Sequence, residues 1–159
     1  MTTTEGTEEP LSIQQRLYPQ LVCFGCGPMN TKGLQLRSYA KDGVIVATFE
    51  PSPEHDNGLG YLNGGIISTL LDCHSAAAVI LEAEEHGWTA LPGTVTPFVT
   101  AGLDVRFRRP APLDQPVDLR AAVLRASEQE ITAEVQLVAD GTTRASALCS
   151  WRRWRPRHE

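Results

Sequence analysis

The sequence predicts an α+β fold in which one antiparallel sheet packs against a single long helix. Residues 63–86 are apolar on almost every side of a helix, which indicates burial on most sides. Residues 95–151 then alternate apolar and polar side chains in several segments, a pattern typical of half-buried strands. A helix that is buried on most sides needs a strongly curved sheet around it, and together they make the two layers of an α+β domain.

The N-terminal residues are expected to lie outside this domain. Residues 1–9 are polar, acidic and low in complexity, which is typical of disorder. Residues 11–21 carry apolar side chains at a loosely helical spacing, which favours a short helix. We therefore expect a disordered or short-helical segment over residues 1–20, one domain over 21–152 and a basic tail over 153–159.

A hairpin is predicted ahead of the long helix. Leu34 and Leu36 alternate with polar residues, and residues 44–49 are rich in β-branched side chains. The pair Asp42-Gly43 between these two runs is a frequent two-residue hairpin turn.

Capping residues set the predicted limits of the long helix. Asn63 is a good N-cap, because its side chain can accept an unpaired amide of the first turn. Gly87 suits the left-handed position that ends many helices. A narrow stripe of small and polar residues runs along this otherwise apolar helix and includes Gly65, Ser68 and Asp72. A carboxylate in so apolar a helix needs a functional or structural reason.

Strand-like segments follow the helix and are joined by short turns. The turns near Glu128-Gln129 and Asp140-Gly141 predict that these strands form an antiparallel meander. The sheet must leave an edge with unpaired backbone groups, so we expect a second copy of the chain to pair there. The predicted strands are residues 95–109, 117–125, 131–138 and 145–151.

Composition and charge exclude several classes of protein. A chain of 159 residues can bury a core without metal or disulfide support. The net charge of −5 argues against nucleic-acid binding. The start is rich in Thr and Glu rather than apolar, so it does not resemble a signal peptide. No apolar run approaches the roughly 20 residues of a membrane-spanning helix. We therefore expect a cytoplasmic protein with reduced thiols and no membrane partner.

Two cysteines raise the question of a metal site. Cys23 and Cys26 form a C-x-x-C pair that could be half of a zinc site, but a second pair is missing. Cys73 with His74 could complete the ligand set, whereas packing is the simpler role for Cys73. A redox motif is disfavoured, because no strand–CxxC–helix context surrounds the pair. We therefore expect neither a metal nor another cofactor.

The loop before the long helix resembles a known signature. Residues 57–65 followed by Asp72 resemble the pattern N-x-x-G-x-x-H-G-G-x-x-x-x-x-x-D of hotdog-fold acyl-CoA thioesterases of the PaaI-like family. Residues 23–34 are similar to the lead-in of one branch of that family. The resemblance covers roughly residues 20–152 and implies the hotdog fold, a curved antiparallel sheet wrapped around one long central helix.

The resemblance also implies a reaction, the hydrolysis of an acyl-CoA thioester to a free acid and coenzyme A. Asp72 would act as general base or nucleophile in a cleft between two subunits. Backbone amides at Gly64 or Gly65 would hold the oxyanion, where the helix dipole also favours negative charge. Asn57 would position the carbonyl or the water, and Thr100 would help to place the water.

Several further residues are candidate contacts with the acyl-CoA substrate. Asn63 and Ser68 lie at the start of the helix and along its small-residue stripe. Arg106, Arg108 and the adjacent Arg109 form a basic group that could meet the phosphates of coenzyme A. The family usually carries His at the position of Asn63, and this exchange could weaken or redirect activity.

Other functions and simpler roles remain open at this point. Asn63 in place of His favours a non-catalytic module that binds acyl-CoA. A hotdog hydratase or dehydratase pairs a catalytic His with an acidic residue, and His55 has no such partner at a matching spacing. Asp72 could be a satisfied polar residue and Thr100 a β-prone strand residue. His74 is expected in the core or at an interface, because adjacent helical positions diverge by about 100°. A dimer and a dimer of dimers are both compatible with the pattern.

Overall fold

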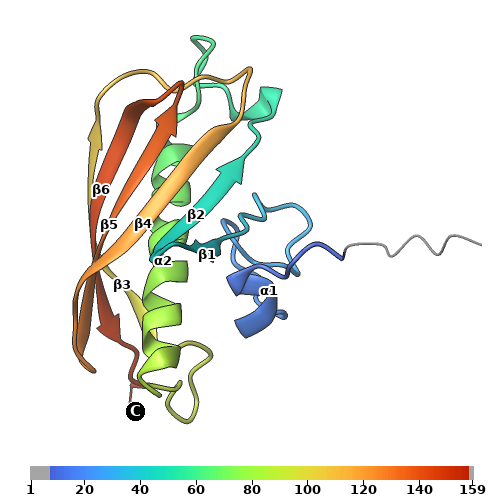
Figure 1. Cartoon of the computed structure of the whole chain (residues 1–159). Coiled ribbons are helices and arrows are strands. Elements are labelled where there is room, and N and C mark those ends of the chain that lie inside the picture. The colour runs from blue at the N-terminus through green and yellow to red at the C-terminus, as the bar shows by residue number, and fades with distance from the viewer. Residues whose placement is uncertain (1–7, 158–159) are drawn as a thin grey trace, which may run out of the picture.

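The computed structural model describes residues 8–157 of the chain (Figure 1). The predicted disorder of the first residues concerns mainly residues 1–7, which lie outside the described range. The described elements are α1 (Ile13–Leu17), β1 (Tyr39–Lys41), β2 (Val44–Phe49), the 3-10 turn η1 (Pro53–His55), α2 (Gly64–Glu85), β3 (Phe98–Phe107), β4 (Val117–Ala126), β5 (Glu130–Ala139) and β6 (Thr142–Arg153).

The strands form one six-stranded sheet in the order β1-β2-β4-β5-β6-β3, with every neighbouring pair antiparallel. The sheet curves around α2, and α1 with its following loop lies on the side of α2 away from β4, β5 and β6 (Figure 1). Alternate residues of β4, β5 and β6 face α2 and are buried with its apolar residues in one core. The predicted α+β hotdog architecture is confirmed.

The predicted meander holds only for β4, β5 and β6. β3 precedes β4 in sequence but pairs with β6 at the far edge, and β2 takes the place beside β4. The connection between β3 and β4 explains the difference, because residues 108–116 contain Pro110, Pro112 and Pro116. Proline lacks an amide donor and fixes φ, so this segment cannot form a tight hairpin and instead crosses the end of the sheet.

The first strand of the predicted hairpin lies later than expected. Leu34 and Leu36 do not join the sheet, because their amides donate to the carbonyls of Phe24 and Gly25, at 2.8 and 3.0 Å. Leu36 is buried in the core and Leu34 packs against it, so the alternation of these leucines reflects burial and not strand pairing. The strand that pairs with β2 is the short β1, which follows Leu36 in the same chain segment.

The predicted limits of the long helix are confirmed. The Asn63 side-chain oxygen accepts the amides of Gly65 and Ile66, at 2.8 and 3.2 Å, which makes Asn63 the N-cap. Gly87 adopts a left-handed φ of 71° just beyond the last turn. By length and composition α2 would qualify as a membrane span, contrary to the prediction that no segment does. More than half of its most apolar window is buried within the fold, as in the core helix of a globular domain.

A buried chain of polar groups ties α2 to the N-terminal segment. The Nε2 atom of His74 lies 2.9 Å from the Ile45 carbonyl oxygen, which can only accept, so Nε2 carries the proton. Nδ1 then accepts the Ser38 hydroxyl at 2.9 Å, and Ser38 Oγ accepts the side-chain amide of Gln14 at 3.0 Å. Burial lowers the pKa of His74 to about 4. His74 is a neutral core histidine, in agreement with the prediction.

Candidate active site

Asp72 and Thr100 meet where α2 passes the edge strand β3. Asp72 is partly buried in the third turn of α2, and the Thr100 hydroxyl donates to its Oδ1 atom at 2.8 Å. The pairing of β3 with β6 shifts register between Thr100 and Gly102, which marks a β-bulge. Bulges often redirect a side chain beside a functional site, and this one lies next to the Asp72 carboxylate. Two predicted catalytic residues that are 28 positions apart are therefore in contact.

The charge on Asp72 is disfavoured by its surroundings. Burial raises the pKa of the Asp72 carboxyl above its ordinary value, the hydrogen bond from Thr100 lowers it in part, and the nearby Cys23 side chain raises it further. The net shift is upward. A carboxylate with a raised pKa is a stronger base, which suits proton abstraction from water.

The start of α2 offers one unengaged amide rather than two. The Gly65 amide already donates to the Asn63 cap, so it is not free to bind a ligand. The Gly64 amide precedes it, and no hydrogen bond among residues 8–157 uses it. Of the two predicted oxyanion donors, Gly64 is therefore the available one. Ser68 is turned back to its own helix, because its hydroxyl donates to the Gly64 carbonyl at 2.9 Å.

Asn57 shapes the loop that leads into α2. Its side-chain oxygen accepts the amides of Leu59 and Tyr61, at 2.8 and 3.3 Å. Asp56 holds the same loop through the amides of Gly58 and Gly60. Since the Asn57 oxygen is engaged inside the loop, its predicted contact with a carbonyl or a water can come only from the side-chain amide nitrogen.

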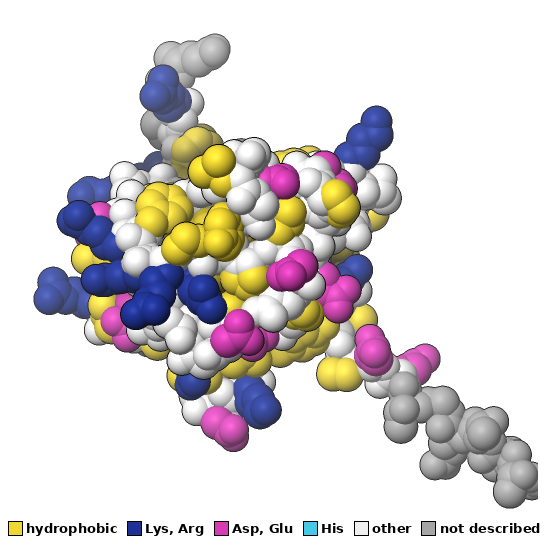
Figure 2. All heavy atoms as spheres, turned by 90° about the horizontal axis from the view of Figure 1, so that it is seen from above, with side chains coloured by type: hydrophobic (Ala, Val, Ile, Leu, Met, Phe, Trp, Pro, Cys, Tyr) yellow, Lys and Arg dark blue, Asp and Glu magenta, His cyan; other side chains and the backbone are white. Residues whose placement is uncertain are grey.

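A pocket of about 430 Å³ joins this loop to the end of β3. Asn57, Gly64, Phe107, Arg108 and Arg109 are among its lining residues. Figure 2 views this end of the molecule and shows Lys and Arg side chains gathered beside a patch of apolar side chains. An apolar pocket with basic residues at its rim suits a ligand that combines a hydrocarbon part with phosphates.

Of the arginines predicted to meet phosphates, only some line this pocket. Arg106 does not line the pocket, and its side chain pairs with Asp104 at 3.3 Å on the exposed surface of β3. Arg108 does line it, with Arg109 beside it. Arg106 lies within β3, whereas Arg108 and Arg109 follow its last residue, Phe107, where the chain leaves the strand and turns along the pocket.

The predicted residues thus form two groups on one chain. Asp72 and Thr100 form the first, and Asn57, Gly64 and Arg108 form the second. Gly64 and Asp72 are eight residues apart on one helix, a rise of about 12 Å. This rise is too long for the Gly64 amide and the Asp72 carboxylate of one chain to contact the same carbonyl group directly.

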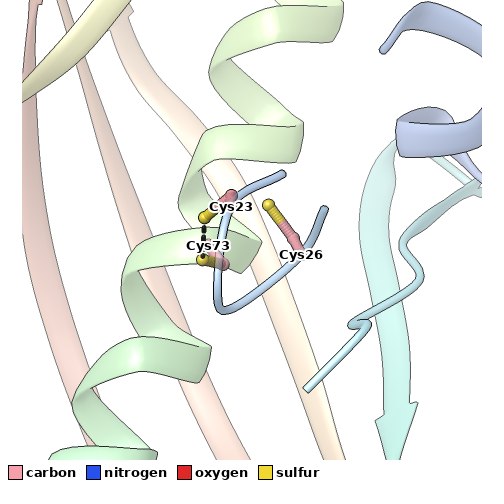
Figure 3. A group of neighbouring side chains, drawn as sticks. All are labelled: Cys23, Cys26 and Cys73. Atoms are coloured by element: carbon pink, nitrogen blue, oxygen red, sulfur yellow. Dashed lines mark hydrogen bonds between the residues drawn. The ribbon is translucent and has the colours of Figure 1, made fainter. Parts of the chain in front are cut away.

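A thiol cluster adjoins Asp72, and it contains Cys73, one of the residues that the sequence offered to complete the C-x-x-C pair. Cys73 faces the C-x-x-C loop, with its sulfur 3.8 Å from that of Cys23, 50 residues away (Figure 3). Hydrogen bonds from the thiols of Cys26 and Cys73 lower the pKa of Cys23, and the backbone amides of Cys26 and Gly25 act in the same direction. The same contacts with Cys23 raise the pKa of Cys26 and of Cys73. Cys73, assigned to packing from sequence, therefore belongs to a polar cluster as well.

Comparison with known proteins identifies the family. A family model described as the thioesterase superfamily matches residues 59–146, more than half of the chain. The chain belongs to the thioesterase superfamily. Membership confirms the family that the loop signature predicted.

Sequence relatives carry a more specific name. The proteins named acyl-coenzyme A thioesterase 13 from Homo sapiens and Pongo abelii are each 26% identical to this chain over 103 residues. These residues are 65% of this chain and 66% of each relative, so the match spans slightly less than two thirds of their length.

Solved structures confirm the fold of this thioesterase-superfamily member. A phenylacetic acid degradation-related protein from Ralstonia eutropha JMP134 aligns with a TM-score of 0.66 and 21% identity, over 89% of this chain and 98% of that one. The Escherichia coli PaaI protein aligns with a TM-score of 0.63 and 19% identity, over 76% and 80% of the two chains. A Bacillus halodurans protein solved with CoA aligns with a TM-score of 0.61 and 24% identity, over 78% and 77%.

Proposed function

We propose that this protein hydrolyses acyl-CoA thioesters with Asp72 as the catalytic base. The single observation that carries the proposal is the partly buried Asp72 carboxylate, with its raised pKa and its hydrogen bond from Thr100. Family membership and the names of the sequence relatives support the reaction class. A structural neighbour solved with CoA supports the coenzyme A part of the substrate.

The proposed active site needs two copies of the chain. β3 is an edge strand of ten residues with Leu103 and Phe107 exposed, so it offers an unpaired edge to a second copy. Near its start, Thr100 hydrogen-bonds to Asp72, and its last residue, Phe107, lies near Gly64. If two β3 strands pair antiparallel, the start of each faces the end of the other. Asp72 of one copy then approaches the Gly64 amide of its partner.

In this arrangement hydrolysis proceeds without a metal. Asp72 removes a proton from a water molecule, and the resulting hydroxide attacks the thioester carbonyl carbon. The Gly64 amide of the partner stabilises the oxyanion, a contribution of about 2.7–4 kcal/mol for a single donor. The carbon–sulfur bond then breaks, and coenzyme A leaves as a thiol after taking up the proton. Thr100 orients the Asp72 carboxylate, and Arg108 faces the phosphates at the pocket rim.

The substitution Asp72→Asn tests the proposed reaction. Purified wild-type protein is incubated with short-chain, long-chain and aromatic acyl-CoAs, and released coenzyme A thiol is measured. Loss of the base should lower kcat by about 10²–10⁴-fold on any substrate that the wild type hydrolyses. The melting temperature should stay the same or rise, because the substitution removes a charge that burial disfavours. Undiminished hydrolysis by Asp72→Asn would exclude this mechanism.

The same experiment addresses the non-catalytic alternative. The side-chain oxygen of Asn63 is engaged as the helix cap, so only its side-chain amide nitrogen could contact a substrate in place of the His that the family pattern usually carries. Tight binding of an acyl-CoA by the wild type without release of coenzyme A would favour a binding module. His55 accepts the Ser52 amide through its Nδ1 atom, so a hydratase reaction could use only its Nε2 atom.

A further inference from the structure

The loop at residues 21–36 and the helix α2 bring three cysteines together. The sulfur atoms of Cys23, Cys26 and Cys73 all lie within 4.8 Å of one another. In Figure 3, Cys23 and Cys26 extend from the loop toward the turn of α2 that carries Cys73. Two thiolates bound to one tetrahedral Zn²⁺ at 2.3 Å are about 3.8 Å apart. Cys23 and Cys73 already have that separation, at 3.8 Å.

Glycines allow the loop to approach the helix this closely. A Cβ atom on Gly25 would collide with the sulfur of Cys73 and would come within 2.8 Å of Thr69 Cγ2. A Cβ atom on Gly27 would collide with the backbone of Cys23, whose carbonyl accepts the Gly27 amide at 2.8 Å. The sequence Cys-Phe-Gly-Cys-Gly therefore folds as a tight turn pressed against α2, with both of its sulfurs on the helix side.

We propose that Cys23, Cys26 and Cys73 bind one Zn²⁺ through three thiolates, with the fourth position taken by an exchangeable ligand. Thiolates select thiophilic cations, and Zn²⁺ is commonly held by cysteine-rich tetrahedral sets. Three converging sulfurs favour a metal over a disulfide, which would engage two of them and leave the third unused. The site does not depend on the thioesterase reaction proposed above.

Neighbouring groups do not supply the fourth ligand within the described part of the chain. Both ring nitrogens of His74 are engaged, by Ser38 and by the Ile45 carbonyl. The Asp72 carboxylate and the thiol of Cys149 lie outside the cluster of mutually close ligand atoms. The bound ion would fasten the loop at residues 21–36 to α2 at the residue that follows Asp72.

Zinc content of the purified full-length protein tests this proposal. Protein purified under reducing conditions is incubated with ZnSO₄, freed of unbound ion by gel filtration and analysed by mass spectrometry for zinc. Wild type and the control Cys149→Ala should carry one zinc per chain. Cys23→Ala, Cys26→Ala and Cys73→Ala should each bind at least roughly 100-fold more weakly, since even changes beyond the ligands cost 10–100-fold.

Zinc K-edge absorption is measured on the wild type alone, so its result does not depend on whether a variant folds. Three sulfur scatterers per zinc are expected at the usual zinc–thiolate distance. Added zinc should also raise the melting temperature of wild type and Cys149→Ala, but not that of Cys73→Ala. Absence of zinc binding by the reduced wild type, or a Cys23–Cys73 disulfide that resists reduction, would overturn the proposal. Unchanged affinity in all three cluster variants would overturn it as well.

Discussion

Among residues 8–157, a single side-chain donor, the hydroxyl of Thr100, hydrogen-bonds to Asp72. This hydrogen bond counteracts the effect of burial on the Asp72 pKa. Replacing the hydroxyl with a methyl group in Thr100→Val should therefore raise the pKa of Asp72 further. Because the ionised form is the base, the acidic limb of kcat/KM against pH should move to higher pH. Activity well above the limb should fall less than in Asp72→Asn.

The pH profile separates this role of Thr100 from a purely structural one. Thr100→Ser keeps the donor and should restore the wild-type limb. A Thr100→Val profile that is lower at every pH but has an unmoved limb would show that Thr100 does not act on Asp72 ionisation.

His74 makes folding sensitive to acid. Its pKa is about 4 in the folded chain, against 6.5 ordinarily, so the unfolded chain binds more protons between these values. Its contribution to stability is therefore complete above pH 6.5 and is lost as the pH falls toward 4. The shift corresponds to about 3 kcal/mol. The free energy of unfolding in urea should fall less between pH 7.5 and pH 4.5 in His74→Gln than in the wild type. An equal loss in both proteins would contradict the assignment.

At this scale the sequence indicated the chemistry of the site but not its hydrogen bonds. The spacing from Asn57 to Asp72 was enough to select Asp72, and Thr100 followed from the family resemblance. The engagement of the Gly65 amide by Asn63 could not be foreseen, because an Asn cap can accept from either of two amides. The thiol cluster needs a contact over 50 residues, which periodicity does not encode.

The loop at residues 21–36 lies directly against α2 at Gly25, which leaves no room for a side chain there. Adding a methyl group in Gly25→Ala forces the loop away from Cys73 and Thr69. Overpacking of this kind should lower the free energy of unfolding by about 1–3 kcal/mol. Gly102→Ala is the matched control, since its new Cβ atom would lie 3.7 Å from Ser150, an ordinary contact. Urea denaturation of both variants measures the difference, and equal stabilities would show that the loop yields easily.

The elements themselves were largely predictable. The ends of α2 followed from Asn63 and Gly87, because caps depend on local chemistry. Leu34 and Leu36 misled, because alternation shows which side chains are buried and not which backbone partner they have. The position of β3 beside β6 is set by tertiary structure, because the proline-rich connection that follows β3 cannot form a tight hairpin to β4.

The division of the site between two chains can be tested on the whole molecule. Gly64→Pro removes the proposed oxyanion donor at the first helical position, where proline is tolerated. It should lower kcat by about 10²–10³-fold, while Gly64→Ala keeps the amide and should stay active. Neither Gly64→Pro nor Asp72→Asn should be active alone.

Mixing these two inactive variants should restore activity. A mixed dimer contains one site with both changes and one site with neither. Random exchange of equal amounts should therefore recover about a quarter of wild-type activity, because half of the dimers are mixed and each has one intact site. Recovery is measured after co-refolding, with each variant refolded alone as control. No recovery despite mixed dimers would place both groups in the same chain.

The two edges of the sheet differ in length, and this difference bears on how far association proceeds. β1 has three residues, whereas β3 has ten. A strand of three residues is a poor template for adding another strand. When two copies join through their β3 strands, each has used its long edge, and only the short β1 edges remain at the ends of the combined sheet. Strand addition therefore stops at two chains instead of continuing into a filament, so the pairing that would build the active site is self-limiting.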